Sequence, residues 1–139
     1  MKNNFINEIS TKGLFHQCTN KDELTTLLNE KSIKAYIGFD CTAPSLHVGS
    51  LLQIMCLRLL QKYGHQPIIL LGGGTTLVGD PSGKDTTRKI LDKKIIDNNI
   101  EKIKKIFQKL LNFKDKKTSP IFVNNAEWLN KLKYIEFLR

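Results

Sequence analysis

The residues best suited to chemistry in this 139-residue chain lie in the segment 36–50. The segment begins with an apolar run and continues with a polar stretch. It ends with His47-Val48-Gly49-Ser50, at the start of an amphipathic helical pattern. The N-terminus of a helix presents unpaired N–H groups and the positive end of the helix dipole, so it attracts anions. His47 can donate a hydrogen bond to a phosphate oxygen, and Gly49 leaves room for a ligand against the backbone. The segment therefore predicts a site for a phosphate-bearing ligand.

A second segment of this kind, 70–84, contains three consecutive glycines at 72–74 and an Asp80-Pro81-Ser82-Gly83 stretch. The glycines are expected to let the backbone approach a ligand, and the Asp80 carboxylate can receive an ammonium group. The segment lacks the lysine of a Walker A loop at the required spacing, so a P-loop is disfavoured. It also lacks a G-x-G-x-x-G pattern followed by an acidic residue, so a nicotinamide-binding site is disfavoured. Taken without its neighbours, the segment at Asp80 also fits an ordinary turn, and His47 fits a surface helix cap.

The elements around these segments alternate between strand and helix. Continuous apolar runs predict strands at 33–39, 67–71 and 121–123, and periodic apolar residues predict helices at 49–63 and 90–113. Before them, an apolar stripe closed by Gly13 and a stretch capped by Asn20 predict two further helices. Asn124 or Asn125 is expected to cap a turn containing Trp128, and a last helix is expected to start at Tyr134.

This alternation indicates an α/β fold, namely a Rossmann-like parallel sheet with helices on both faces. Ligands of such sheets bind outside the carboxyl ends of the strands. Both glycine-bearing segments leave the carboxyl ends of predicted strands. We therefore expect His47 and Asp80 to open onto one crevice.

Composition narrows the class of protein. Charged residues make up 25% and hydrophobic residues 40%, with a net charge of +9 concentrated at 84–117. That basic stretch fits either a solvated lysine-rich helix or a surface that attracts polyanions. The chain has no apolar run of membrane-spanning length, and its cysteines fit no zinc pattern. Its first residues lack the apolar run of a signal peptide, so we expect no secretory signal. We expect a cytoplasmic protein with reduced thiols and no membrane partner.

Segments 36–50 and 70–84 together resemble the active site of the class I aminoacyl-tRNA synthetases, in particular of those for tyrosine. The resemblance implies activation of L-tyrosine with ATP to tyrosyl-adenylate and pyrophosphate, and transfer of tyrosine to the 3′ end of tRNA(Tyr). It implies ATP with Mg²⁺ as substrate, no metal or prosthetic group bound by the protein, and a homodimer. Catalysis of this kind is positioning and electrostatic stabilisation, with no protein nucleophile.

The resemblance also implies roles for individual residues. It assigns tyrosine binding to Tyr36, Gly38, Asp40 and Asp80, and ATP binding to Asp40, Thr42, His47, Gly49, Ser50 and Gln53. It assigns catalytic roles to Thr42, His47, Ser50, Lys84 and Arg88, of which the last two would neutralise pyrophosphate. Tyr36 is expected at the end of its strand, pointing toward the crevice.

Three positions depart from the family pattern. Ser50 replaces a second histidine, Ile37 stands where many members carry a thiol, and Cys41 stands where many have proline. A serine hydroxyl can still donate to a ribose or phosphate oxygen, so the site is expected to tolerate Ser50. We expect the Cys41 thiol to be a buried or neutral bystander.

The resemblance covers nearly the whole chain, but no second signature loop follows. We therefore expect residues 1–139 to be the N-terminal part of the nucleotide-binding catalytic domain, and to be inactive alone. Two alternatives remain: an inactive nucleotide-binding remnant, and a nucleotidylyltransferase of the same superfold. The 38–50 and 78–83 segments argue against the second.

Overall fold

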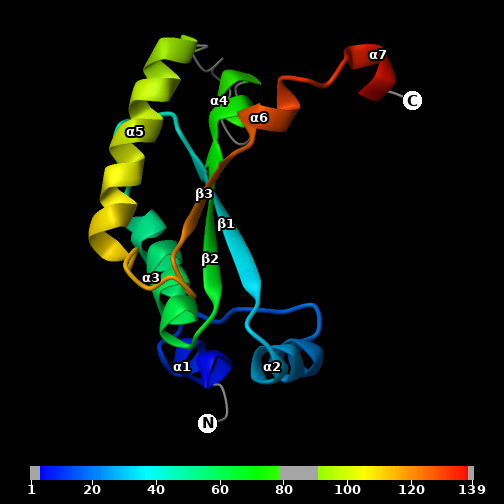
Figure 1. The fold of residues 1–139 in the computed structure, drawn as a ribbon, viewed down its shortest axis with the longest axis vertical. Helices are drawn as coiled ribbons and strands as arrows, with labels where there is room; N and C mark the ends of the chain where they lie inside the picture. The colour runs from blue at the N-terminus through cyan, green and yellow to red at the C-terminus, as the bar shows by residue number, and fades with distance from the viewer. Residues whose placement is uncertain (1–3, 79–90, 138–139) are drawn as a thin grey trace.

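The computed structural model describes residues 4–78 and 91–137, and its centre is a parallel sheet. Three strands, β1 (Lys34–Asp40), β2 (Gln66–Gly72) and β3 (Ile121–Asn124), pair in the order β1-β2-β3 (Figure 1). Both pairings are parallel, with Asp40 opposite Gly72 and Ile68 opposite Ile121. The predicted parallel sheet is confirmed, with strand ends displaced by one residue at most.

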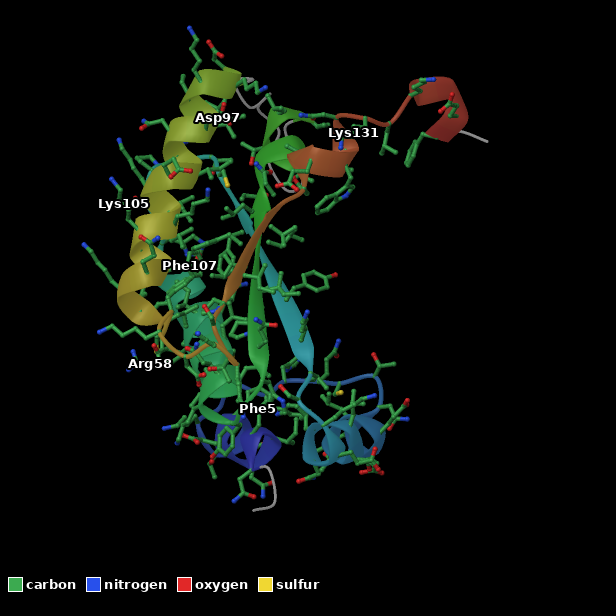
Figure 2. All side chains as sticks on the ribbon, viewed as in Figure 1. Phe5, Arg58, Asp97, Lys105, Phe107 and Lys131 are labelled. Carbon is green, nitrogen blue, oxygen red and sulfur yellow. The ribbon has the colours of Figure 1, made fainter. Side chains whose placement is uncertain are left out.

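Two long helices, α3 (Val48–Lys62) and α5 (Lys93–Leu110), cover one face of this sheet (Figure 1). Phe39 and Leu71 of the strands pack there in one buried cluster, whose helical members are Ile54, Leu57, Ile96, Ile100, Ile103 and Phe107. The side chain of Phe107 points from α5 toward the sheet, whereas Lys105 points outward (Figure 2). We expected helices on both faces; in the described residues, both long helices lie on this one.

The opposite face of the sheet is open in the described part of the chain. Side chains alternate along a strand, so Tyr36, Gly38 and Asp40 share this face. Tyr36 is 68% exposed, and the neighbouring Ile68 and Leu70 of β2 are only half-buried.

The N-terminal helices α1 (Phe5–Thr11) and α2 (Lys21–Glu30) lie at the amino ends of the strands (Figure 1). They form a second apolar cluster through Ile6, Ile9 and Leu28, together with Leu60 of α3. The predicted cap is confirmed, because the Asn20 side chain accepts the Glu23 N–H at 3.1 Å.

Helices at the other end of the sheet differ in part from expectation. Residues Gly73–Val78 form a short helix, α4, for which we had predicted no helix. Helix α5 begins at Lys93 and ends at Leu110, within the expected 90–113, because the Asp92 side chain accepts the Lys94 N–H and caps it.

The C-terminal segment holds two short helices, α6 (Ala126–Leu129) and α7 (Tyr134–Phe137). The cap of α6 comes from Asn124, whose side chain accepts the Ala126 N–H at 3.0 Å. Among the described residues, no helix has the length and apolar character needed to cross a bilayer.

His65, between α3 and β2, makes stability depend on pH. It is 2% exposed, its Nδ1 accepts the Ile33 N–H at 3.3 Å, and burial lowers its pKa from the ordinary 6.5. The unfolded chain therefore takes up a proton at a higher pH than the native chain does. We predict that the free energy of unfolding, measured by urea denaturation, falls as the pH is lowered through 6.5.

The matched variant is His65→Asn, which keeps an acceptor near the position of Nδ1 but does not titrate. It should be less stable at neutral pH, and its free energy of unfolding should change less over the same pH range. An unchanged pH dependence in this variant would show that His65 is not the group responsible.

Candidate active site

A cavity of about 530 Å³ lies where β1 ends and α3 begins. Its lining includes Gly38, Asp40, Thr42, His47, Ser50 and Gln53, all of which belong to the predicted site, and also Phe39, Ala43, Ser45 and Leu46. The structure therefore brings together the predicted residues of segment 38–53 at the carboxyl end of a parallel strand, which is where such sheets bind ligands.

The two ring nitrogens of His47 have different roles. It is the N-cap of α3, and its Nδ1 accepts the Gly49 N–H at 3.0 Å. Because Nδ1 is the acceptor, the neutral ring carries its hydrogen on Nε2. His47 can therefore hold the start of the helix with one nitrogen and donate to a ligand in the cavity with the other.

Gly49 is required by this arrangement. A Cβ atom at this position would lie 2.7 Å from Cε1 and 2.9 Å from Nδ1 of His47. The missing side chain therefore makes room for the imidazole, and the expectation that it also makes room for a ligand stays a prediction.

Asp40, the last residue of β1, depends on a glycine in the same way. A Cβ atom on Gly72 would lie 3.0 Å from Oδ1 of Asp40 and 2.7 Å from Oγ1 of Thr75. Gly72 thus admits the carboxylate, which remains exposed at the edge of the sheet.

Gly73 and Gly74 make room for two asparagines. The Asn124 side chain lies against Gly73, and Asn125 Oδ1 accepts the Gly74 N–H at 2.7 Å. Asn125 Nδ2 also donates to Oγ1 of Thr75 at 3.1 Å. The positions at 73 and 74 are therefore filled by side chains of the chain itself, and not by the ligand that we expected there.

Gly38 is the exception among these glycines. A Cβ atom there would meet only Cδ2 of Leu70, at an ordinary 3.9 Å. Packing within the described chain therefore does not demand a glycine, and the space above it stays open. This space lies between Tyr36 and Asp40 on the uncovered face of the sheet.

Tyr36 lies on that face but not where we expected it. It is the third residue of β1, not its end, and it is not among the residues that line the cavity. Asp80, Lys84 and Arg88 lie outside the described residues, so the shared crevice of His47 and Asp80 stays a prediction.

Two residues that sequence analysis missed hold the loop of this site. Thr76 and Asn99 are buried, and both bond to the peptide groups of Cys41. The only signal for Asn99 in the sequence was an amide within the apolar stripe of a helix. Cys41 is itself fully buried, as expected, and burial raises the pKa of its thiol to about 11. That this thiol takes no part in the chemistry stays a prediction.

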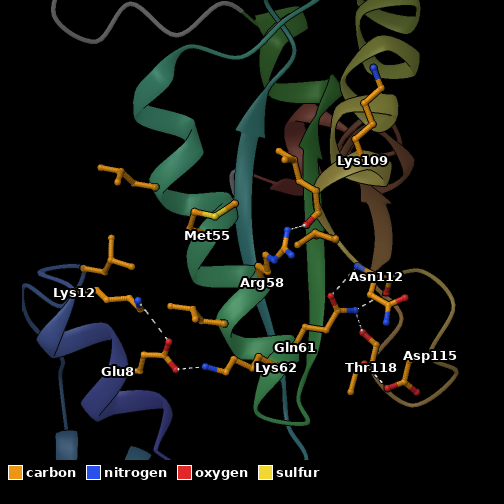
Figure 3. A pocket seen from close by; sticks show the side chains of 15 residues that line it. Glu8, Lys12, Met55, Arg58, Gln61, Lys62, Lys109, Asn112, Asp115 and Thr118 are labelled. Atoms are coloured by element: carbon orange, nitrogen blue, oxygen red, sulfur yellow. Dashed lines mark hydrogen bonds and ion pairs between the residues drawn. The ribbon is translucent and has the colours of Figure 1, made fainter.

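A larger cavity, of about 800 Å³, lies between α1, α3 and the end of α5 (Figure 3). Its polar groups bond to one another: Lys62 pairs with Glu8 at 2.7 Å, and Arg58 donates to the Leu110 carbonyl at 3.0 Å. It contains none of the predicted site residues and lies away from the carboxyl ends of the strands. We therefore assign the candidate site to the smaller cavity.

The fit between Gly49 and His47 yields a test. In Gly49→Ala, the added methyl group displaces the imidazole and breaks its bond to the residue 49 N–H. We predict that ¹⁵N spectra of the neutral His47 ring change from the single Nε2–H tautomer to a mixture. Gly38→Ala is the control, since its methyl group faces the same cavity without approaching His47. Identical spectra for Gly49→Ala and the wild type would contradict the assignment.

Comparisons with known proteins show the family and the fold of this chain. The family model "tRNA synthetases class I (W and Y)" matches residues 28–139. A tyrosine–tRNA ligase of Pelagibacter ubique is 63% identical over 137 residues, which are 99% of this chain and 34% of that protein. One from Wolbachia pipientis is 58% identical over 139 residues, which are 99% of this chain and 33% of that protein. The chain thus spans about a third of the length of these relatives.

Solved structures match as well. A C-terminally truncated mitochondrial tyrosyl-tRNA synthetase of Aspergillus nidulans aligns with a TM-score of 0.76 at 28% identity, over 97% of this chain and 41% of that one. The Archaeoglobus fulgidus tyrosyl-tRNA synthetase, complexed with L-tyrosine, supports the fold alone, with a TM-score of 0.60 at 21% identity over 83% of this chain and 32% of that one. With its family model matched from residue 28 to residue 139, the chain belongs to the class I tRNA synthetases of the tryptophan and tyrosine group.

Proposed function

We propose that this chain supplies the ATP site and part of the tyrosine site of a tyrosine–tRNA ligase. The observation that carries the proposal is the cavity in which Gly38, Asp40, Thr42 and His47 meet, at the carboxyl end of β1. The similarity of the chain to tyrosine–tRNA ligases supports tyrosine as the amino acid.

The proposed phosphate side of the site is the start of α3. Thr42, His47 and Ser50 line the cavity there, and each can donate a hydrogen bond through a hydroxyl or through Nε2. Negative charge moves onto the pyrophosphate oxygens as the reaction proceeds, so fixed donors stabilise the transition state more than bound ATP. Lys84 and Arg88 are proposed to add positive charge on the same side.

The proposed reaction needs no nucleophile from the protein. A carboxylate oxygen of tyrosine attacks the α-phosphorus of ATP, and the bond from that phosphorus to the bridging oxygen of the β-phosphate breaks. Pyrophosphate leaves with the Mg²⁺ that arrived with ATP. A hydroxyl at the 3′ end of tRNA(Tyr) then attacks the carbonyl carbon of tyrosyl-adenylate, and AMP leaves as the ester forms. The contribution of this chain is alignment of the two substrates and stabilisation of charge.

The proposed tyrosine side follows β1. At a rise of about 3.3 Å per residue, Tyr36 lies roughly 13 Å from Asp40 along the strand. A tyrosine lying over Gly38 would direct its ammonium group to Asp40 and Asp80, and its phenol to the hydroxyl of Tyr36. This arrangement accounts for a glycine at position 38 that packing within the chain does not require. A homodimer belongs to the proposal on the family resemblance alone, and a cytoplasmic location on the composition and cysteine content of the chain.

The proposal is tested by tyrosine-dependent exchange between ATP and pyrophosphate in the full natural polypeptide. His47→Asn keeps a side chain that caps helices but shortens the donor that reaches the cavity. We predict that the exchange rate falls about 100-fold, as for loss of one transition-state donor, and that the Kd for tyrosine changes less than about twofold. His16→Asn, at an exposed histidine outside the cavity, should behave as the wild type.

Each other outcome of this experiment excludes part of the proposal. Nucleotide binding without exchange would favour an inactive remnant, and exchange that depends on a different co-substrate would favour a nucleotidylyltransferase. Equal losses in rate and in tyrosine affinity would contradict the transition-state role of His47.

Gly38→Ala tests the tyrosine side. The added methyl group enters open space in the free protein, so the free energy of unfolding should hardly change. With tyrosine over residue 38, the methyl group meets the substrate, and we predict that the KM for tyrosine rises at least about fivefold. Gly74→Ala is the contrasting variant, because its Cβ would press on Ala126 and Leu129 and lower stability instead. An unchanged KM in Gly38→Ala would place tyrosine elsewhere.

A further inference from the structure

We propose that Thr76 and Asn99 are positioning residues that hold the backbone of Cys41, and through it the site residues Asp40 and Thr42. We call the two side chains the Cys41 clamp. The inference deepens the proposed function, on which its kinetic consequence rests.

The geometry of the clamp is complete on both sides of residue 41. The Cys41 N–H donates to Oγ1 of Thr76 at 3.0 Å, and Nδ2 of Asn99 donates to the Cys41 carbonyl at 2.9 Å. Cys41 is 0%, Thr76 6% and Asn99 3% exposed, so water does not compete for these bonds. The acceptor, Thr76, belongs to α4 and the donor, Asn99, belongs to α5.

The clamp lies just beyond the last backbone pairing between β1 and β2. Pairing between β1 and β2 ends at Asp40 and Gly72, and residues 41–47 form an irregular loop before α3. Buried peptide groups without partners would cost free energy, and in this loop the clamp supplies both partners of Cys41. Since Asp40 precedes and Thr42 follows this peptide, its placement fixes the backbone from which both side chains reach the cavity.

The two clamp residues are themselves held in place. Asn99 lies among the buried apolar residues Ile96, Ile100 and Ile103 of α5, where an amide is costly unless it is bonded. Thr76 belongs to α4, which Asn125 ties to the end of β3 through the Gly74 N–H and Thr75. The loop of the site is thereby connected to α5 and, through α4, to the end of β3.

The first test is kinetic and uses the full natural polypeptide. Thr76→Val and Asn99→Leu keep the approximate volume but remove the acceptor and the donor. We predict that kcat/KM for ATP in pyrophosphate exchange, normalised to active sites, falls about threefold to tenfold in each. Thr76→Ser, which keeps Oγ, should stay within about twofold of the wild type.

Cys41→Pro provides the control that separates positioning from packing. It removes the N–H that Thr76 accepts and leaves Thr76 untouched. If Thr76 acts through this N–H, Thr76→Val should cause no further loss in the Cys41→Pro background. Equal losses in both backgrounds, or wild-type kinetics in Thr76→Val, would overturn the proposal.

The second test does not depend on the proposed reaction. By hydrogen–deuterium exchange, Thr76→Val and Asn99→Leu should speed uptake in peptides spanning 40–47, with little change in β2. Unchanged uptake at 40–47 would refute the clamp. If the wild type lacks tyrosine-dependent exchange while the variants show this faster uptake, the proposed function fails and the clamp stands.

Discussion

The candidate site depends on the parallel register between β1 and β2. Pairing from Lys34 opposite Gln66 to Asp40 opposite Gly72 ends both strands at one level. The register is enforced by Phe39 and Leu71, which are buried under α3 and α5. A shift of β1 by one residue would exchange its two faces, turning Phe39 outward and the Asp40 carboxylate toward the core. Core packing on one face thus determines which side chains the other face presents.

The glycines at this edge of the sheet have different structural roles. Gly49 gives space to the His47 ring, and Gly72 gives space to the Asp40 carboxylate, so each permits a polar group to take a defined position. Gly38 touches no such partner and leaves an opening on the uncovered face. The distinction matters because the first kind of glycine builds the protein's own site, whereas the second kind leaves room for something that is not part of the described chain.

The sequence predicted those features that local pattern decides. Apolar runs located the three strands, and the pattern that begins at His47 located the start of α3. The family resemblance, and not local pattern, indicated the residues that line the cavity, such as Asp40 and Thr42. Sequence-based prediction failed where contacts between residues distant in the sequence determine the structure. The helix Gly73–Val78 forms against glycine's preference because Asn125 and neighbouring helices stabilise it, and the contacts of Thr76 and Asn99 with Cys41 join positions 35 and 58 residues apart. Tyr36 was wrongly expected at the end of its strand, because the predicted strand at 33–39, like the observed one at Lys34–Asp40, already continued beyond it.

The central claim is that the cavity at the end of β1 binds ATP and tyrosine together. It is tested most directly by a crystal structure of the full natural polypeptide with MgATP and tyrosinol, an analogue without the attacking carboxylate. The account predicts phosphate oxygens within hydrogen-bonding distance of Nε2 of His47 and of the start of α3, with the phenol ring over Gly38. The account would be contradicted by a nucleotide bound elsewhere, such as in the larger cavity between α1, α3 and the end of α5 (Figure 3), with Nε2 of His47 left without a ligand.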